Sequence, residues 1–191
     1  MNLVLASGSP RRHEILELGG FSHEIFVSNV EEIMDETDPA KLVLSLSRQK
    51  CGAVAEMLKG KADTVVIGAD TVVAVDGKIL GKPHDREEAK AMIKLIAGRE
   101  HEVFTGVTLQ DTQTGKTASF CEKSVVRVVG LSEKEINDYI DLKEPYDKAG
   151  GYAIQGAFAK YISGIDGDYY NIMGFPLCHF ALEIKKFEEN K

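Results

Sequence analysis

Short apolar runs alternate with amphipathic stretches along the first third of the chain. Leu3-Val4-Leu5-Ala6 is typical of a buried strand, and the Ser9-Pro10 pair that follows is typical of a helix start. Gly19-Gly20 would end that helix. The pattern predicts, in order, a strand over residues 2–6, a helix from Pro10 to about Leu18, a strand near 22–27 and a longer helix beginning at Asp38-Pro39.

The rest of the chain carries strand and hairpin patterns between capped helices. An apolar, β-branched run at 64–69 predicts a strand, and Asp76-Gly77 predicts a hairpin turn between 72–75 and 78–80. Strands mixed with helices and hairpins predict an α/β fold with a mixed sheet in a single domain spanning residues 1–191. The remaining predicted elements are a helix capped by Asp85 and Glu88 that ends near Gly98, strands over 101–110 and 116–129, a helix capped by Ser132 and Glu135, two short strands plus a loop within 144–174, and a C-terminal helix from Pro176.

Composition and charge limit the partners of the chain. Of its 191 residues 43% are apolar, and 23 basic against 30 acidic residues give a net charge of −7. Proteins that bind nucleic acid polymers usually carry a basic excess, so DNA or RNA is not expected, although a local basic cluster could bind a small anion. No apolar stretch approaches the ~20 residues of a membrane span, so no membrane partner is expected. The three cysteines lack metal-binding spacing. We therefore expect a soluble, cytoplasmic protein with reduced thiols.

Two arginines stand where a helix normally avoids positive charge. Arg11 and Arg12 follow Pro10 in the first predicted helical turn, where free N–H groups and about half a positive charge already lie. A bound anion such as a phosphate would remove the cost of this arrangement. The alternative is that both guanidinium groups point into water. The corner is not a P-loop, because the required glycine and lysine pattern is absent.

A carboxylate interrupts the apolar β-run between Thr64 and Val75. Asp70 stands within this run, and a charge in such a position usually has a partner or a chemical role. The alternative is a structural salt bridge. Lys82 follows the hairpin that returns the chain toward Asp70, so it could be that partner or a cation directed at a phosphate.

The segment 144–156 combines paired glycines with polar side chains. Gly150-Gly151 suggests a close backbone approach, for example to a ligand. Gln155 carries an amide that can both donate and accept, which suits recognition of the edge of a base. The alternative is a tight turn with solvated charges.

Five ordered blocks together resemble the Maf family of nucleoside triphosphate pyrophosphatases, essentially from end to end. Any one block is weakly specific, whereas five in the same order are not expected by chance. His13, Gly151 and Phe175 depart mildly from the family pattern. The blocks are Leu5-Ala6-Ser7-Gly8-Ser9-Pro10-Arg11-Arg12, Gly68-Ala69-Asp70-Thr71-Val72-Val73, Gly81-Lys82-Pro83, Glu144-Pro145 through Gln155-Gly156, and Gly167-Asp168-Tyr169-Tyr170-Asn171 with Gly174 and Pro176.

The resemblance implies a fold, an activity and a cofactor. The fold would be an elongated mixed β-sheet flanked by helices, with two lobes and a deep cleft, similar to inosine triphosphate pyrophosphatases. The family hydrolyses a nucleoside triphosphate to its monophosphate and pyrophosphate with a divalent cation, usually Mg²⁺ or Mn²⁺. The family often forms homodimers and is associated with septum inhibition.

The resemblance also assigns roles to individual residues. Asp70 would be the proton acceptor that activates water, and Glu32 would join it near the metal. Lys82 would act in catalysis. The triphosphate site would be lined by Ser7, Arg11, Arg12, Lys50 and Lys82, and base preference would be set by Arg12, Thr71 and Gln155.

Thr71 and the Arg11-Arg12 pair resemble the branch of the family that prefers dTTP and UTP. In the branch that acts on 7-methyl-GTP, glutamine typically follows the central aspartate. We therefore expect a dTTP/UTP pyrophosphatase, whose substrates could include modified pyrimidine triphosphates. Two alternatives remain open: a purine-selective pyrophosphatase of the same family, and a nucleotide-sensing regulator of septum formation. The presence of Asp70 and Lys82 favours catalysis, because a sensor needs no base.

Overall fold

One seven-stranded mixed sheet organises the chain in the computed structural model, which describes residues 1–189. The strand order is β2-β1-β3-β5-β6-β7, and β4 pairs with β3 off this path. β1 runs parallel to β2 and β3, whereas the other pairs are antiparallel. This confirms the predicted α/β class with a mixed sheet. The strands are β1 (Asn2–Leu5), β2 (His23–Ile25), β3 (Thr64–Val75), β4 (Lys78–Leu80), β5 (Glu100–Asp111), β6 (Thr117–Val128) and β7 (Ile162–Asp166).

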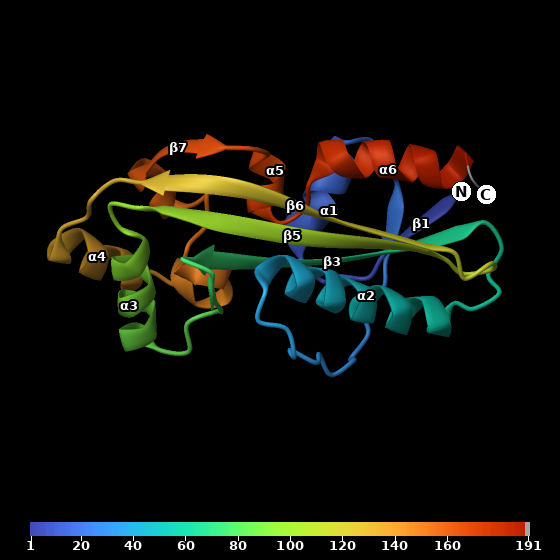
Figure 1. The fold of residues 1–191 in the computed structure, drawn as a ribbon, viewed down its shortest axis with the longest axis horizontal. Coiled ribbons are helices and arrows are strands. Elements are labelled where there is room, and N and C mark those ends of the chain that lie inside the picture. Colours follow the sequence, from blue (N-terminus) through green and yellow to red (C-terminus); the bar gives the residue numbers. More distant parts are fainter. Residues whose placement is uncertain (190–191) are drawn as a thin grey trace.

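Helices cover both faces of the sheet and one of its ends (Figure 1). α2 packs on one face, where Val54 contacts the cluster around Val66 of β3. α6 packs on the opposite face, where Phe180 joins the cluster of Val65 and Ile67. Because side chains alternate along a strand, β3 needs apolar residues on both faces, as its sequence provides. The helices are α1 (Pro10–Leu18), α2 (Pro39–Met57), α3 (Arg86–Ile96), α4 (Glu133–Ile140), α5 (Tyr169–Met173) and α6 (Leu177–Glu189), with 3₁₀ helices η1 (Glu144–Asp147), η2 (Ala149–Gly151) and η3 (Ala157–Tyr161).

The molecule is elongated because β3, β5 and β6, each 12 residues long, run through most of its length (Figure 1). One core region, which includes Val75, Ile93 and Ile140, lies at the end near α3 and α4. A second, which includes Ile67 and Phe180, lies at the end near α6. This arrangement agrees with the expected elongated sheet flanked by helices.

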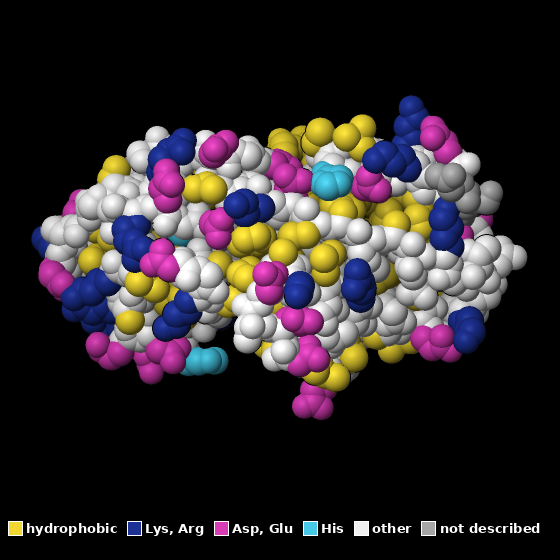
Figure 2. All heavy atoms as spheres, in the orientation of Figure 1, with side chains coloured by type: hydrophobic (Ala, Val, Ile, Leu, Met, Phe, Trp, Pro, Cys, Tyr) yellow, Lys and Arg dark blue, Asp and Glu magenta, His cyan; other side chains and the backbone are white. Residues whose placement is uncertain are grey.

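Figure 2 shows acidic and basic side chains scattered over the face in view, without a large field of one sign. No helix within residues 1–189 is both long enough and apolar enough to cross a membrane.

The segment 144–174 differs from the two short strands that we predicted there. It holds the three 3₁₀ helices, a single strand, β7, and the five-residue α5. Gly150 and Gly151 have φ angles of 69° and 74°, which a strand cannot accommodate. The backbone at Gly150 does approach another group closely, as predicted, but that group belongs to the protein. The Gly150 N–H donates to Gly81 O at 2.9 Å, and a Cβ at Gly150 would lie 2.9 Å from a methyl group of Val73. The close approach that the structure shows at Gly150 is therefore to protein, and a contact of these glycines with a ligand stays a prediction.

Helix α2 lies close to the sheet because two glycines face it. A Cβ on Gly68 of β3 would lie 2.3 Å from the carbonyl oxygen of Ser47, and one on Gly106 of β5 would lie 2.4 Å from that of Val43. Both distances are shorter than any van der Waals contact allows, so these positions require glycine for space. The close approach brings the α2 residue Lys50 to the face of β3 on which Asp70 lies.

Candidate active site

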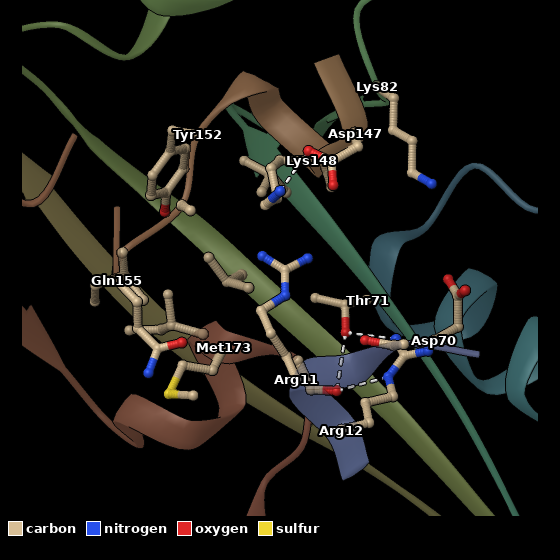
Figure 3. Close-up of a pocket in the computed structure, with 18 of the residues that line it drawn as sticks. Arg11, Arg12, Asp70, Thr71, Lys82, Asp147, Lys148, Tyr152, Gln155 and Met173 are labelled. Atoms are coloured by element: carbon tan, nitrogen blue, oxygen red, sulfur yellow. Dashed lines mark hydrogen bonds and ion pairs between the residues drawn. The ribbon is translucent and has the colours of Figure 1, made fainter. Parts of the chain in front are cut away.

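A pocket opens where β3 lacks a strand neighbour. On one side β3 pairs with β1 over Thr64–Ile67 and with β4 over Val73–Val75, which leaves residues 68–72 unpaired on that side. Asp70 and Thr71 lie in this gap and line a pocket of about 210 Å³ (Figure 3). Its walls include residues of both core regions, so it lies in a cleft between the two ends of the sheet.

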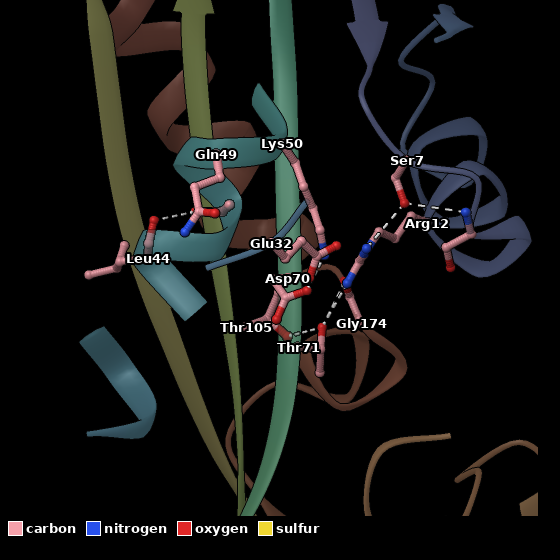
Figure 4. A network of polar contacts seen from close by, with 12 residues as sticks. Ser7, Arg12, Glu32, Leu44, Gln49, Lys50, Asp70, Thr71, Thr105 and Gly174 are labelled. Atoms are coloured by element: carbon pink, nitrogen blue, oxygen red, sulfur yellow. Dashed lines mark hydrogen bonds and ion pairs between the residues drawn. The ribbon is translucent and has the colours of Figure 1, made fainter. Parts of the chain in front are cut away.

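Arg12 is held in place by three hydrogen bonds from its guanidinium group. Nε donates to the carbonyl oxygen of Gly174 at 2.9 Å, Nη1 donates to Ser7 Oγ at 3.1 Å and Nη2 donates to Thr71 Oγ1 at 3.1 Å (Figure 4). Burial lowers the pKa of Arg12, and the nearby Asp70 carboxylate opposes that effect. Because these partners come from the loop after β1, from β3 and from the end of α5, Arg12 ties three segments together beside the pocket.

The Thr71 hydroxyl continues this network into the sheet. It lies 2.9 Å from Thr105 Oγ1, and Thr105 donates to the carbonyl oxygen of Asn171 at 3.1 Å. Since the Thr105 proton is used on Asn171, Thr71 accepts from Arg12 and has Thr105 Oγ1 at 2.9 Å and the more distant Gly174 O at 3.4 Å as acceptors for its own proton. The buried amide of Asn171 donates in turn to Val103 O at 3.1 Å. Thr71 is therefore fixed on both sides of its hydroxyl.

Asp70 forms a salt bridge with Lys50, which also contacts a second carboxylate. Lys50 Nζ lies against Asp70 Oδ1 and 3.2 Å from Glu32 Oε1. The side chain of Asp70 is only 13% exposed and that of Glu32 is 40% exposed. The sequence left open a salt bridge from Asp70 to Lys82; a salt bridge exists, but its partner is Lys50. The two carboxylates thus share one ammonium group at the edge of the pocket (Figure 4).

Positive charge dominates the pocket walls. Among the lining residues five are cationic, and only Asp70 and Asp147 are acidic. Arg11 and Lys82 form no ion pair or hydrogen bond with any residue in 1–189, and both side chains point into the pocket (Figure 3). Such a concentration of cations in a chain of net charge −7 favours binding of an anion there. The cationic lining residues are Arg11, Arg12, Lys50, Lys82 and Lys148.

The structure brings the nine candidate residues from the sequence together in two adjoining hollows. Ser7 and Glu32 line a second hollow of about 200 Å³, which shares Lys50 with the main pocket. Gln155 lies across the main pocket from Thr71, on the turn before η3 (Figure 3). The main pocket is lined by Arg11, Arg12, Lys50, Asp70, Thr71, Lys82 and Gln155.

Lys148 was missed as an individual site residue, although its segment was recognised. It lines the pocket and forms an ion pair with its neighbour Asp147, which lowers the pKa of that carboxyl group. The signal in the sequence is a lysine directly before the glycine-rich turn. Only the fold shows that this turn faces Arg11 and Lys82.

Comparisons with known proteins agree with this geometry. A family model described as "Maf-like protein" matches residues 2–187. A "dTTP/UTP pyrophosphatase" of Lachnoclostridium phytofermentans is 47% identical over 188 residues, covering 97% of this chain and 94% of that protein. A "dTTP/UTP pyrophosphatase" of Bacillus cytotoxicus is also 47% identical, over 97% of this chain and 95% of that protein.

A likeness to solved structures is more distant. A Staphylococcus aureus Ham1 protein aligns with 67% of this chain and 72% of its own, with a TM-score of 0.42 and 10% identity. A likeness at that level has no bearing on activity.

Proposed function

This chain belongs to the Maf-like protein family, and we propose that it hydrolyses dTTP and UTP to the monophosphate and pyrophosphate. The observation that carries this proposal is the cationic pocket at the unpaired edge of β3, with the Asp70 carboxylate inside it. A triphosphate is the anion that such a pocket fits, because its negative charge is spread over several phosphates. The relatives described above support the choice of nucleotide.

The triphosphate would lie among the cations of the pocket. Arg11 and Lys82 form no hydrogen bond or ion pair within residues 1–189, so they can bind phosphate oxygens without breaking one. Lys148 is available as a further cation once it leaves Asp147. Cleavage between the α and β phosphates places charge on the departing pyrophosphate, and fixed cations lower the energy of that state. We assign this stabilisation first to Lys82 and Arg11, because neither side chain has a competing hydrogen bond or ion pair within residues 1–189.

Asp70 would accept the proton of the attacking water. One of its oxygens lies against Lys50, and the carboxylate stands at the gap in β3, within reach of the pocket. Proton transfer to a positioned carboxylate accelerates hydrolysis by typically 10²–10⁴-fold. Lys50 holds Asp70 in a fixed orientation, and the close packing of α2 on Gly68 in turn fixes Lys50.

A divalent cation, Mg²⁺ or Mn²⁺, fits the two carboxylates at this edge. Asp70 and Glu32 both contact one ammonium group, so together they already form a binding site for positive charge. No group of three or more His, Cys, Asp and Glu residues within 1–189 could hold a metal by itself. That suits Mg²⁺, which usually takes one or two carboxylates and completes its shell with phosphates and water. When bound, such an ion neutralises charge on the phosphates.

Base selection would fall to Gln155, Thr71 and Arg12. The Gln155 carboxamide has no hydrogen-bond partner within residues 1–189, so it is free to donate to and accept from the edge of a pyrimidine. Thr71 and Arg12 are bound to each other, and they would shape the wall that the base contacts.

A substrate panel tests this function directly. Pyrophosphate release would be measured from dTTP, UTP, CTP, GTP, 7-methyl-GTP and ITP with Mg²⁺ or Mn²⁺. We expect fastest release from dTTP and UTP. Release only from a purine triphosphate would favour a purine-selective member of the family, and binding without release would favour a nucleotide-sensing regulator. A homodimer, a cytoplasmic location and a link to septum inhibition stay predictions.

A further inference from the structure

The direction of the Gln155 side chain is set by the backbone turn that carries it. Gln155 is exposed and lies on the segment between Ala153 and η3. Gln155 lines the pocket, and no hydrogen bond within residues 1–189 fixes its carboxamide, so the turn determines where this side chain starts. Whatever holds the turn therefore determines where the amide can meet a base.

The carboxylate of Glu144 holds the end of this turn, in addition to the backbone hydrogen bond from the Gly156 N–H to Ala153 O at 3.2 Å. Glu144 Oε2 accepts a hydrogen bond from the Ala157 N–H at 2.9 Å. Its Oε1 accepts from the Tyr139 hydroxyl at 3.0 Å. Glu144 thus connects the turn to α4, which lies in the core region at the α3 end of the sheet. None of the roles proposed above uses this residue.

Gly156, next to Gln155, leaves room for the Glu144 carboxylate. A Cβ on Gly156 would lie 2.1 Å from Glu144 Oε2 and 2.4 Å from Oε1. The backbone of Gly156 has a φ of −107° and a ψ of −159°, which any residue can adopt. Glycine is therefore needed here for space and not for its conformational freedom. The carboxylate of Glu144 therefore lies directly against Gly156, the residue after Gln155.

The other end of this contact is rigid. Tyr139 is 3% exposed, and its ring centroid lies 4.9 Å from that of the fully buried Phe158. Burial raises the pKa of Tyr139, and the neighbouring Glu144 raises it further, so the phenol stays protonated and donates to the carboxylate. A carboxylate anchored on a buried phenol is a fixed support for the turn.

We infer that Glu144 is the positioning residue that fixes the base-selecting Gln155, acting through Ala157 and Gly156, and so sets the discrimination among pyrimidine triphosphates. The inference rests on the proposed function. UTP and CTP share sugar and phosphates and differ in the hydrogen-bonding edge of the base. A turn that has lost its support lets the Gln155 amide sample other directions, which weakens discrimination and leaves the phosphate contacts intact.

Two substitutions at Glu144 separate positioning from charge. Glu144→Ala removes both hydrogen bonds and opens space beside Gly156. Glu144→Gln keeps the size, accepts from Ala157 through its oxygen and donates its amide to the Tyr139 hydroxyl. We expect Glu144→Ala to lower the ratio of kcat/KM for UTP over CTP about tenfold, the equivalent of one lost hydrogen bond, and Glu144→Gln to retain most of the wild-type ratio.

A double-mutant cycle with Gln155→Ala makes the test specific. If Glu144 acts only through Gln155, Glu144→Ala adds no further loss of the UTP/CTP ratio in the Gln155→Ala background. The matched control is Glu122→Ala. This partly buried glutamate of β6 pairs with His179 of α6, away from Gln155. Its loss is expected to leave the UTP/CTP ratio unchanged.

Four outcomes decide the inference. A tenfold lower ratio in Glu144→Ala that Glu144→Gln restores supports it. An unchanged ratio in Glu144→Ala, a loss that adds to that of Gln155→Ala, or a Gln155→Ala ratio equal to wild type overturns it. If Glu144→Ala does not fold, Tyr139→Phe removes only the hydroxyl bond and is expected to lower the same ratio. If the wild-type chain releases no pyrophosphate, the proposed function fails, and the dissociation constants of UTP and CTP for the same variants still test the inference.

Discussion

Two adjacent arginines in the pocket differ in how the protein uses them. Arg12 makes three hydrogen bonds to Ser7, Thr71 and Gly174, whereas Arg11 makes none within residues 1–189. The helix-start pattern treats both alike, and only the resemblance to the family gave Arg12 the further role in base preference. The difference arises because Arg12 faces β3 and the end of α5, and Arg11 faces the open pocket (Figures 3 and 4).

Replacing each arginine by alanine separates these roles. We expect Arg12→Ala to lower kcat/KM by about 10²–10³-fold, as loss of a fixed cationic donor does, and to lower the free energy of unfolding by about 1–2 kcal/mol. Arg11→Ala is expected to raise KM with little change in stability. Steady-state kinetics and urea unfolding measure the two effects. Equal losses of stability in both variants would contradict the assignment.

A buried histidine makes the stability of the fold depend on pH. His101 is 2% exposed, its Nε2 lies 2.6 Å from the Tyr152 hydroxyl, and its Nδ1 has no partner among residues 1–189. Burial lowers the pKa of His101 to about 4 from its ordinary value of 6.5. The folded protein therefore keeps this ring neutral at pH values where the unfolded chain already binds a proton.

Because the pKa of His101 is lower in the folded protein than in the unfolded chain, acid destabilises the fold. The contribution of His101 to the free energy of unfolding is fully present above pH 6.5. It is lost as the pH falls toward 4, by about 3 kcal/mol in total. Urea unfolding between pH 4 and 7 is the measurement. His101→Gln is expected to remove this part of the slope, whereas His84→Gln, at an exposed position, is expected to leave it. An unchanged slope in His101→Gln would rule out this origin.

At the scale of elements, much of the secondary structure could be predicted from local chemistry. Asp38 caps α2 by accepting from the Lys41 N–H, and Ser132 and Glu135 form the expected reciprocal capping box. The Asp85 cap is half as expected: Asp85 accepts from the Glu88 N–H, but the Glu88 carboxylate accepts from the N–H of His84. Such caps need only neighbouring residues, which is why the sequence reveals them.

Contacts between distant elements could not be predicted. The partner of Asp70 is Lys50, on a helix whose distance from the sheet depends on Gly68 and Gly106. The gap in β3 depends on where β1 ends and where β4 begins. The resemblance to a family supplied the site residues by position, whereas their mutual arrangement needed the fold.

The packing of α2 gives a prediction with a matched control. Gly68→Ala places a methyl group 2.3 Å from the Ser47 carbonyl oxygen and is expected to destabilise the fold by about 1–3 kcal/mol. Gly52→Ala lies within α2, where the nearest atom is 3.9 Å away, and is expected to stabilise by about 0.5–1 kcal/mol. Urea unfolding compares them. Equal effects would show that α2 does not approach the sheet as described.

Across the whole molecule, the three long strands connect the two core regions. β3, β5 and β6 each contribute residues to both, so we propose that the chain forms one domain and unfolds as one unit. We expect a single transition by both tyrosine fluorescence and circular dichroism in urea. Two separated transitions would instead indicate two units that unfold independently, with the boundary at the pocket.

Positive charge is concentrated in one part of the molecule. A chain with a net charge of −7 gathers five cationic residues around one pocket, while the face in Figure 2 carries both signs. The positive field is therefore local, which suits a small polyanion better than a nucleic acid polymer. Asp70 is the carboxylate of that pocket to which we assign proton transfer.

The most direct test of this account is Asp70→Asn with UTP as substrate and Mg²⁺ present. Pyrophosphate release and the dissociation constant of UTP would be measured on the same preparation, with Asp76→Asn, in the exposed β3–β4 turn, as control. We expect release to fall by about 10³-fold or more while UTP binding is largely retained, because the cations that hold the phosphates remain. Release at the wild-type rate from Asp70→Asn would contradict the account.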